Sequence, residues 1–560
     1  MAACTADETP KGTLPALSTA NPPPETATTA AAGDQVESDS DVPLVASPLP
    51  TPLLPTAIPD TPVPSVPRTA IKGGDALPRT LRDTVANIID ARSERFMWGA
   101  AEENGEQVRL EVGGEVPLAD WFYAPAAPFA TTADNISMSD IMQGWNTGES
   151  NLGRLILDNT TSAVFSQIWG PPSPSVQVVE DGTLIDSLWA GRPSWTLIAF
   201  DELVPGLKVL TLDDQSLLDP ELDISQYPLS IPIGLNGSGR AVQSVLTAWG
   251  DVSSNRNPDL ITRVSMTGVT ALSRATAYQM ELRGITTPGL VVGPVLEDAD
   301  IAHISHEVSF VEDCPYPNPI GDPIFCARDE YLELLTSIGA DVIELTGNHL
   351  NDWGAEYSAR SIDMYEAARM HTFGGGRNLE EAEQPLLLEI NGSKIAFVGC
   401  NPVGPAGDWA DTSRSGSRPC DYDALYQQIR ELKEAGYLVI ATLQYAEYYS
   451  YAAPPNQTAD FRALIDAGAD AVSGSQGHHA QGFDLYKGGF IHYGLGNLFF
   501  DQMDMLGTRQ SFIDTYVVYD GKLISVELFT SLIEDWCCPR AMTAEERVDL
   551  LETVFEASGW

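Results

Sequence analysis

Short apolar runs alternate with helix-like segments between residues 258 and 530. The apolar runs predict β-strands at 260–268, 301–307, 341–347, 394–399, 438–444 and 470–475. The segments between them predict helices at 271–283, 329–338, 356–370, 422–435 and 458–467. Because strands separated by helices are buried on both faces, the pattern predicts an α/β domain with a mostly parallel or mixed sheet. The notable polar residues follow the strand ends, where ligands bind in such sheets.

Residues 76–250 predict a smaller α/β domain ahead of this sheet. Its signals are an amphipathic helix within 134–145 and two strands around the turn Pro205-Gly206. The run WTLIAFDELVPGLKVL…SQYPL faintly resembles periplasmic solute-binding proteins of the phosphate-binding type. A plain α/β packing domain is the alternative. Because this segment contains neither His nor Cys, we do not expect a His-based catalytic or metal site in it.

Three local signals mark the ends of elements. Asn391-Gly392 predicts a two-residue hairpin turn. Asp352 is predicted to cap the helix that follows it. Thr543 and Glu546 have the spacing of a capping box and predict a terminal helix within 531–560.

The first 75 residues differ in composition from the rest. They hold 14 of the 40 prolines, and Thr, Ala and Ser fill most of the gaps. Such residues bury too little surface to offset the entropy of ordering, so residues 1–75 predict a disordered tether. Met1-Ala2-Ala3-Cys4 resembles the end of a bacterial lipoprotein signal, which predicts lipidation of Cys4 and a place on the outer face of the membrane. A secreted protein, or an ordinary start with a chance Cys, is the alternative.

The charge of the chain narrows the classes of partner. Acidic residues number 78 and basic residues 31, which gives a formal net charge of −47. Such a surface repels phosphate backbones and anionic lipids, so we expect no nucleic-acid partner and membrane attachment by a lipid anchor at most. The 43% of hydrophobic residues excludes wholesale disorder.

The cysteines predict an oxidising compartment. Cys314 and Cys326 bracket a Pro/Gly-rich loop that closes easily, and we predict a disulfide between them. Cys400 and Cys420 bracket a second such loop. The adjacent pair Cys537-Cys538 is not expected to reach one common partner. Buried free thiols are the alternative.

All seven histidines fall between residues 303 and 492. Three segments there resemble a known family: TGNHLNDWG (346–354), the stretch 371–399, and QGHHAQGFDLYKGGFIHYGLGNLFFDQ (476–502). They are similar, in the same order, to segments of the bacterial poly-γ-glutamate capsule-synthesis proteins (CapA/PgsA type). These proteins have the calcineurin-like metallophosphoesterase fold. The resemblance covers about 265–505 and implies a four-layer αββα domain over 258–530.

The resemblance also implies roles for individual residues. Metallophosphoesterases use metal ions to clamp phosphate oxygens and activate water, and a His to protonate the leaving oxygen. Carried over, His349 would be the general acid. The metal ligands would be Glu307, Asn348 and His478. The expected substrate-binding residues are Glu447, Gln444 and Gln476.

The sequence departs from the family pattern at four positions. Val269, Ser305, Gln444 and Gln476 stand where the resemblance leads us to expect Asp, Asn, His and His. Val cannot replace a carboxylate, and Gln is a poor ligand for Zn or Mn, although harder cations such as Ca accept it. We therefore expect a degenerate site that holds one divalent ion or none.

The leading hypothesis is a cell-envelope protein that handles an extracellular anionic polymer of the capsule type. Its partner would be that polymer or a small anion. An active metal-dependent phosphoesterase or polymer hydrolase is one alternative. A tethered solute-binding protein, in which the first domain captures a small ligand, is another.

Overall fold

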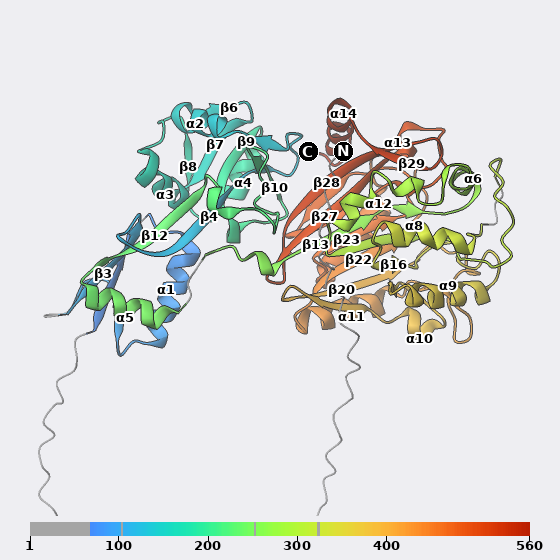
Figure 1. Cartoon of the computed structure of the whole chain (residues 1–560), viewed down its shortest axis with the longest axis horizontal. Coiled ribbons are helices and arrows are strands. Elements are labelled where there is room, and N and C mark those ends of the chain that lie inside the picture. Colours follow the sequence, from blue (N-terminus) through green and yellow to red (C-terminus); the bar gives the residue numbers. More distant parts are fainter. Residues whose placement is uncertain (1–67, 75, 102–104, 251–253, 322–324) are drawn as a thin grey trace, which may run out of the picture. The chain divides into compact units, whose positions relative to one another are not determined.

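The computed structural model describes residues 68–74, 76–101, 105–250, 254–321 and 325–560 (Figure 1). The predicted tether lies outside these residues except at its end, where Thr69–Gly73 forms strand β1 of a sheet. Cys4 and its lipidation also lie outside the described residues. No helix in the described part of the chain is long and apolar enough to cross a bilayer.

Residues 69–249 build a mixed sheet with helices packed against it. The strand order is β2-β1-β3-β12-β4-β9-β7-β6, with β10 beside β4 and β8 beside β7. The strands are β1, β2 (Phe96–Trp98), β3 (Gln107–Val112), β4 (Val116–Pro128), β6 (Glu149–Ser150), β7 (Gly153–Asp158), β8 (Gln177–Val179), β9 (Ser194–Ala199), β10 (Leu207–Val209) and β12 (Ser230–Gly237). A separate pair is β5 (Asn135–Ile136) with β11 (Thr211–Leu212). The helices are α1 (Arg79–Ala91), α2 (Met138–Thr147), α3 (Asn159–Trp169), α4 (Leu184–Ala190) and α5 (Gly239–Trp249).

Strand β4 joins the two halves of this sheet. Its first half pairs antiparallel with β12, and its second half pairs with β9 and β10. Helix α2 lies in the predicted amphipathic segment and starts at a capping box between Ser137 and Asp140. The predicted pair of strands around Pro205-Gly206 does not form a hairpin, because β9 and β10 both pair with β4.

The remaining residues build two larger sheets. One has the order β17-β16-β15-β13-β27-β28-β29, with β14 joining β15 to β26, and the other β19-β20-β22-β23-β25-β24. The first contains β13 (Ile261–Thr267), β14 (Val269–Thr270), β15 (Ile301–His306), β16 (Val342–Glu344), β17 (His371–Phe373), β26 (Asn497–Phe499), β27 (Gln510–Tyr519), β28 (Lys522–Glu534) and β29 (Cys538–Ala541). The second contains β19 (Leu386–Ile390), β20 (Ser393–Cys400), β22 (Leu438–Gln444), β23 (Ala471–Ser475), β24 (Phe483–Tyr486) and β25 (Gly489–His492). A short pair is β18 (Gly375–Gly376) with β21 (Gly416–Ser417). The helices are α6 (Arg274–Arg283), α7 (Gly293–Glu297), α8 (Leu332–Ser337), α9 (Ala355–Ala367), α10 (Leu379–Ala382), α11 (Tyr422–Glu434), α12 (Pro455–Ala467), α13 (Leu506–Arg509) and α14 (Ala544–Ala557).

Three apolar clusters separate these sheets and helices into layers. In β22, Leu438 and Ile440 face the other sheet, whereas Val439 and Ala441 face α11 and α12, as the two-residue period of a strand requires. On the far side, α6, α8 and α9 pack against β15, β16 and β27. The layers therefore run helices, sheet, sheet, helices, and the predicted mixed α/β class is confirmed.

The predicted hairpin turn and the predicted disulfide are both present in the structure. Asn391-Gly392 makes the tight turn between β19 and β20, with both residues at positive φ (48° and 77°). Disulfides join Cys314 to Cys326, as predicted, and Cys400 to Cys420. Cys537 and Cys538 are joined to each other. From the sequence we considered only a common third partner for this adjacent pair and did not anticipate a bond between the two.

Candidate functional site

The predicted site residues come from the carboxyl ends of strands in both large sheets. Glu307 follows β15, and Asn348 and His349 follow β16. Gln444 is the last residue of β22, and Gln476 follows β23. Gly347 allows the Asn348 loop to approach β15, because a Cβ at this position would lie 2.5 Å from the Glu307 Cα.

Four of these side chains meet at one point. The carboxamide nitrogen of Gln444 donates to Glu307 Oε2 (3.3 Å), to Asn348 Oδ1 (3.3 Å) and to Gln476 Oε1. Glu307, Gln444 and Gln476 are no more than 3% exposed. On the other side of the carboxamide, Ser475 Oγ donates to Gln444 Oε1 at 2.7 Å. The structure thus brings together residues expected to bind metal and residues expected to bind substrate.

The backbone of this region is strained at the residues after β23. Gln476 has φ 72° and His478 has φ 47°, the left-handed region that costs residues other than Gly about 1–2 kcal/mol each. Gly477 lies between them. Such outliers persist where surrounding contacts fix them, and they gather at functional sites.

His349 is held by a carboxylate and an aromatic ring. Its Nδ1 pairs with Asp352 Oδ2 at 2.8 Å, and its ring lies 4.1 Å from that of Phe325. Burial opposes protonation, but the hydrogen bond to Asp352 and the negative charges of Glu307, Asp352 and Asp408 raise the pKa of His349 above its usual value. The imidazole is therefore a group able to carry a proton and a positive charge.

Asp352 does not have the predicted capping role. Helix α9 begins at Ala355 behind Gly354 and has no side-chain cap. Asp352 Oδ2 instead accepts from His349 and from the Phe325 amide (2.7 Å). The capping prediction was wrong because the chain turns for two more residues before the helix starts.

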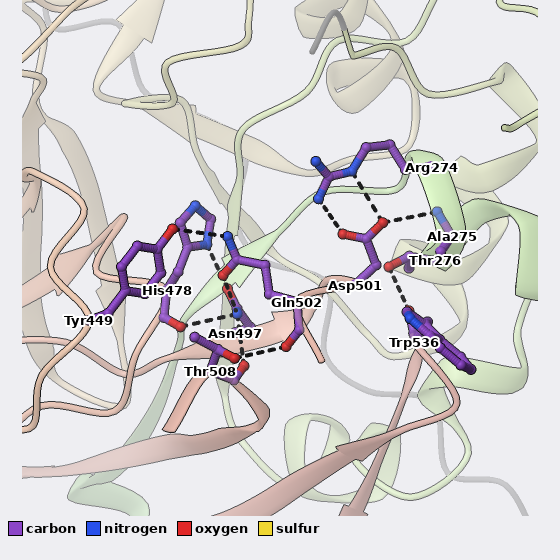
Figure 2. Close-up of polar contacts among 10 residues, drawn as sticks. All are labelled: Arg274, Ala275, Thr276, Tyr449, His478, Asn497, Asp501, Gln502, Thr508 and Trp536. Carbon is purple, nitrogen blue, oxygen red and sulfur yellow. Dashed lines mark hydrogen bonds and ion pairs between the residues drawn. The ribbon is translucent and has the colours of Figure 1, made fainter. Parts of the chain in front are cut away.

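His478 lies on a wall of aromatic and charged side chains. Its Nδ1 pairs with Asn497 Oδ1 at 2.7 Å, and its ring stacks on Phe500 at 4.8 Å. Arg274 lies over the rings of both Phe325 and Phe500 and pairs with Asp501. Figure 2 shows Asp501 bridging Arg274 and the Ala275 amide, and Asn497 bridging His478 and Thr508. Phe325 and Phe500 thus connect the surroundings of His349 to those of His478.

Glu447 is an exposed residue that contacts this cluster through Gln476. It accepts from Gln476 Nε2 at 3.4 Å and from the Tyr449 hydroxyl at 2.7 Å. Tyr449 in turn accepts from Gln502 Nε2 at 3.3 Å (Figure 2). A chain of contacts therefore links all seven predicted catalytic, metal-binding and substrate-binding residues at one edge of the two sheets. Their roles remain predictions.

Sequence reasoning missed several residues that build the crevice. Ser475 orients Gln444, and the buried Glu344 pairs with His303 Nε2 at 3.0 Å behind it. Polar residues within otherwise apolar strands were the signal for both. Asp501 lies within the family-like segment 476–502, whereas nothing in the sequence singled out Arg274.

The residues present do not fit a two-metal centre. No group of three or more His, Cys, Asp and Glu gathers for a metal in the part of the chain that the structure describes. Val269 is 1% exposed and pairs with Ser305 on β15 and with Asn497 on β26, so an apolar side chain stands at the strand end where the resemblance calls for a carboxylate. The donors that do converge are one carboxylate and two amide oxygens, and an amide nitrogen lies among them.

The other histidines do not supply the missing ligands. His303 pairs with Glu344, and His306 Nδ1 with the Tyr365 hydroxyl at 2.6 Å. His479 Nδ1 pairs with the adjacent Ala480 carbonyl. These rings are engaged in the interior and not directed at the Gln444 cluster.

A family model and two curated relatives point to the same kind of protein. Residues 245–502 match the family model described as "Bacterial capsule synthesis protein PGA_cap". The chain is 30% identical over 217 residues to "Capsule biosynthesis protein CapA" of Bacillus anthracis, covering 38% of this chain and 53% of that one. It is 27% identical over 174 residues to "PGA biosynthesis protein CapA" of Bacillus subtilis, covering 31% and 46%. The chain thus spans about half the length of the curated relatives it matches.

Among solved structures, the 5'-nucleotidase precursor of Thermus thermophilus is 12% identical, with a TM-score of 0.31. The alignment covers 53% of this chain and 58% of that one. A likeness this low carries no argument about function.

Proposed function

Because residues 245–502 belong to the bacterial capsule synthesis protein family, we propose that this chain handles an anionic capsule polymer, of the poly-γ-glutamate kind, outside the cell. The observation that carries the proposal is the cluster of polar side chains at the strand ends of the two sheets, all of which lie within the matched residues. These side chains would recognise the polymer and would not hydrolyse it with a pair of metal ions.

The chemistry of the crevice suits a polyamide that bears carboxylates. Asn348, Gln476 and Gln502 offer amide donors and acceptors of the type that a peptide-like backbone needs. The neighbouring carboxylates raise the pKa of His349, and its protonated form would offer a charge-assisted hydrogen bond to a carboxylate of the polymer.

Exposed aromatic side chains near the crevice support the same proposal. Tyr448 and Tyr449 are each 43% exposed beside Glu447, and Trp353, which follows Asp352, is 39% exposed. Flat amphipathic rings of this kind pack on the methylene groups of a polymer while their polar atoms stay in water.

The proposed location outside the cell rests on the disulfides. Cys314–Cys326 and Cys400–Cys420 close two loops, and such bonds persist in oxidising compartments. Attachment through a lipid on Cys4 is part of the proposal. Intact-mass analysis of the protein from native membranes tests it, because an unmodified Cys4 behind Met1 would contradict it.

Binding of the full chain to purified poly-γ-glutamate tests the function. Fluorescence anisotropy of a labelled polymer should give saturable binding that His349→Ala weakens about tenfold, the value of one charge-assisted contact. The matched control is His371→Ala, because His371 starts β17 at the opposite end of the strands. Polyphosphate of similar length is the comparison polymer. No binding, or equal binding by both variants, would contradict the proposal.

A second candidate is a phosphoesterase with an altered site. The His349–Asp352 pair favours it, because a His held by a carboxylate is a suitable proton donor to a leaving oxygen. Hydrolysis of bis-p-nitrophenyl phosphate in the presence of Mn²⁺ tests it. Turnover that is abolished by His349→Ala would favour this candidate over polymer handling alone.

A third candidate places ligand capture in the first sheet. Two arginines of α1 approach carboxylates that follow β4 in the chain. Arg79 pairs with Glu202 at 2.9 Å, and Arg82 lies 3.9 Å from Asp181. The two guanidinium groups would be the anion-binding groups in this candidate. Calorimetric titration of the full chain with phosphate tests the idea, and no heat from phosphate would count against it.

A further inference from the structure

Gln444, Glu307, Asn348 and Gln476 form the Gln444 cluster. It contains more hydrogen-bond acceptors around the Gln444 nitrogen than that nitrogen has hydrogens to donate. Three oxygens, from Glu307, Asn348 and Gln476, surround a carboxamide nitrogen that carries only two hydrogens. The other carboxylate oxygen, Glu307 Oε1, is buried and has no hydrogen-bond partner among the described residues. A buried acceptor without a donor is costly, so this cluster has an unmet demand for positive charge.

The orientation of the carboxamide follows from the same contacts. Turned over, Gln444 would direct its own oxygen at the three surrounding oxygens, and the repulsion would be strong. In the observed orientation, its oxygen instead accepts from Ser475 Oγ at 2.7 Å. Gln444 is 1% exposed, so this arrangement is isolated from bulk water.

We propose that the Gln444 carboxamide is the built-in occupant of a latent site for one cation, and that its nitrogen lies where that ion would be held. The three oxygens come from three different strand ends and converge on one atom, as ligands converge on an ion. The partial positive charge of the N–H groups takes the place of the ion. A cation could enter only if the nitrogen left, which would remove its contacts with all three oxygens.

The substitution Gln444→Glu tests the inference with little change in shape. It replaces the nitrogen by an oxygen, so that two carboxylates and two amide oxygens face each other. Hard cations such as Ca²⁺ and Mn²⁺ prefer this donor set. After EDTA treatment, the full-length variant should bind one Mn²⁺ about 100-fold more tightly than the wild type, measured by Mn²⁺ electron paramagnetic resonance in about 0.1 M NaCl.

Two controls separate a built site from added charge. Gln427→Glu, on the exposed face of α11, adds the same charge far from the crevice and should bind Mn²⁺ as the wild type does. Adding Glu307→Gln to Gln444→Glu removes one carboxylate again and should abolish the gain.

The folding of Gln444→Glu is measured separately, by thermal unfolding. Without a cation, two facing carboxylates repel each other, so Gln444→Glu should have a lower thermal midpoint than the wild type, and Mn²⁺ should restore it. Gln444→His, which offers an imidazole ligand, is the second variant. If neither variant folds in Mn²⁺, or both fold without gaining Mn²⁺ affinity over Gln427→Glu, the inference is wrong.

One further result would overturn it. If the wild type itself binds one Mn²⁺ as tightly as Gln444→Glu, and Glu307→Gln abolishes that binding, then the carboxamide does not exclude the ion. The readout is metal binding, so it is independent of the polymer. Absence of polymer binding would contradict the proposed function and leave this inference standing.

Discussion

Asp408, which the sequence analysis did not single out, is one of the charges that raise the pKa of His349. Burial and the nearby charge of Asp352 raise the pKa of Asp408 to about 6, although its hydrogen bond from the Asn351 amide works in the opposite direction. The sequence placed Glu307, Asn348 and Gln444 at strand ends because apolar runs end there. It could not indicate which way a carboxamide turns, or that a carboxylate from a distant loop reaches His349, because these depend on packing between segments far apart in the chain.

The raised pKa of Asp408 predicts a pH-dependent stability. The folded state holds this proton more tightly than the unfolded state, so the stabilisation is complete below about pH 4 and is lost as pH rises to about 6. Asp408→Asn, which keeps the acceptor for Asn351, should raise the free energy of unfolding above pH 6 by about 1–3 kcal/mol and change it little at pH 4. Urea unfolding at several pH values measures this.

Asp411 offers the matched control for that experiment. It is in the same loop but exposed, and the amide of Ser413 lowers its pKa. Asp411→Asn should therefore not stabilise the protein above pH 6. An Asp408→Asn variant with the same pH profile as the wild type would contradict the prediction.

At the scale of elements, periodicity predicted strands and helices well where the signal was local. The six predicted strands of 258–530 all exist, because each contains closely spaced apolar residues that become buried. Strand β1 was missed since only Ala70 and Ile71 are buried in a five-residue strand, and its partner β3 lies far along the chain. Strand β4 gave no signal because Pro117, Pro125 and Pro128 interrupt its pattern. Here pairing with several neighbours outweighs local propensity.

The loop between β20 and α11 illustrates support of one element by another. Cys400 and Cys420 close it, and from within it the carbonyls of Gly407 and Ser415 accept from the Asn351 side chain beside His349. The disulfide therefore restrains a segment that helps to position the crevice.

Removing this disulfide should be costly. Cys400→Ser with Cys420→Ser frees a loop of 20 residues in sequence separation, which should lower the free energy of unfolding by about 3 kcal/mol. Urea unfolding measures it, and Ser413→Ala in the same loop is the control with the bond intact. A loss equal to that of the control would show that the bond does not restrain the loop.

At the scale of the whole molecule, the net charge of −47 should govern encounter with any anionic polymer. Like charges repel over a distance of about 30 Å at 0.01 M salt but only about 8 Å at 0.15 M. The sequence predicted this acidic character and the α/β class directly. It could not predict that the His349 ring and the Arg274 guanidinium both pack against Phe325.

Binding of poly-γ-glutamate should therefore strengthen as salt is added. Between about 0.01 and 0.15 M NaCl we expect an increase in affinity of several-fold, the reverse of the salt dependence of nucleic-acid binding. Anisotropy titrations across this range measure it, with sucrose of equal osmolarity as the control. An affinity that falls with salt would mean that local positive contacts outweigh the overall charge.

Ser558 and Trp560 both contact Phe483. Ser558 Oγ accepts from the Phe483 amide at 2.8 Å, and the Trp560 ring stacks on that of Phe483 at 6.2 Å. Phe483 opens β24, a few residues after His478 and His479. An affinity tag or a fluorescent label appended to Trp560 would therefore disturb the packing at the start of β24, so a surface-tethered assay should carry its handle elsewhere.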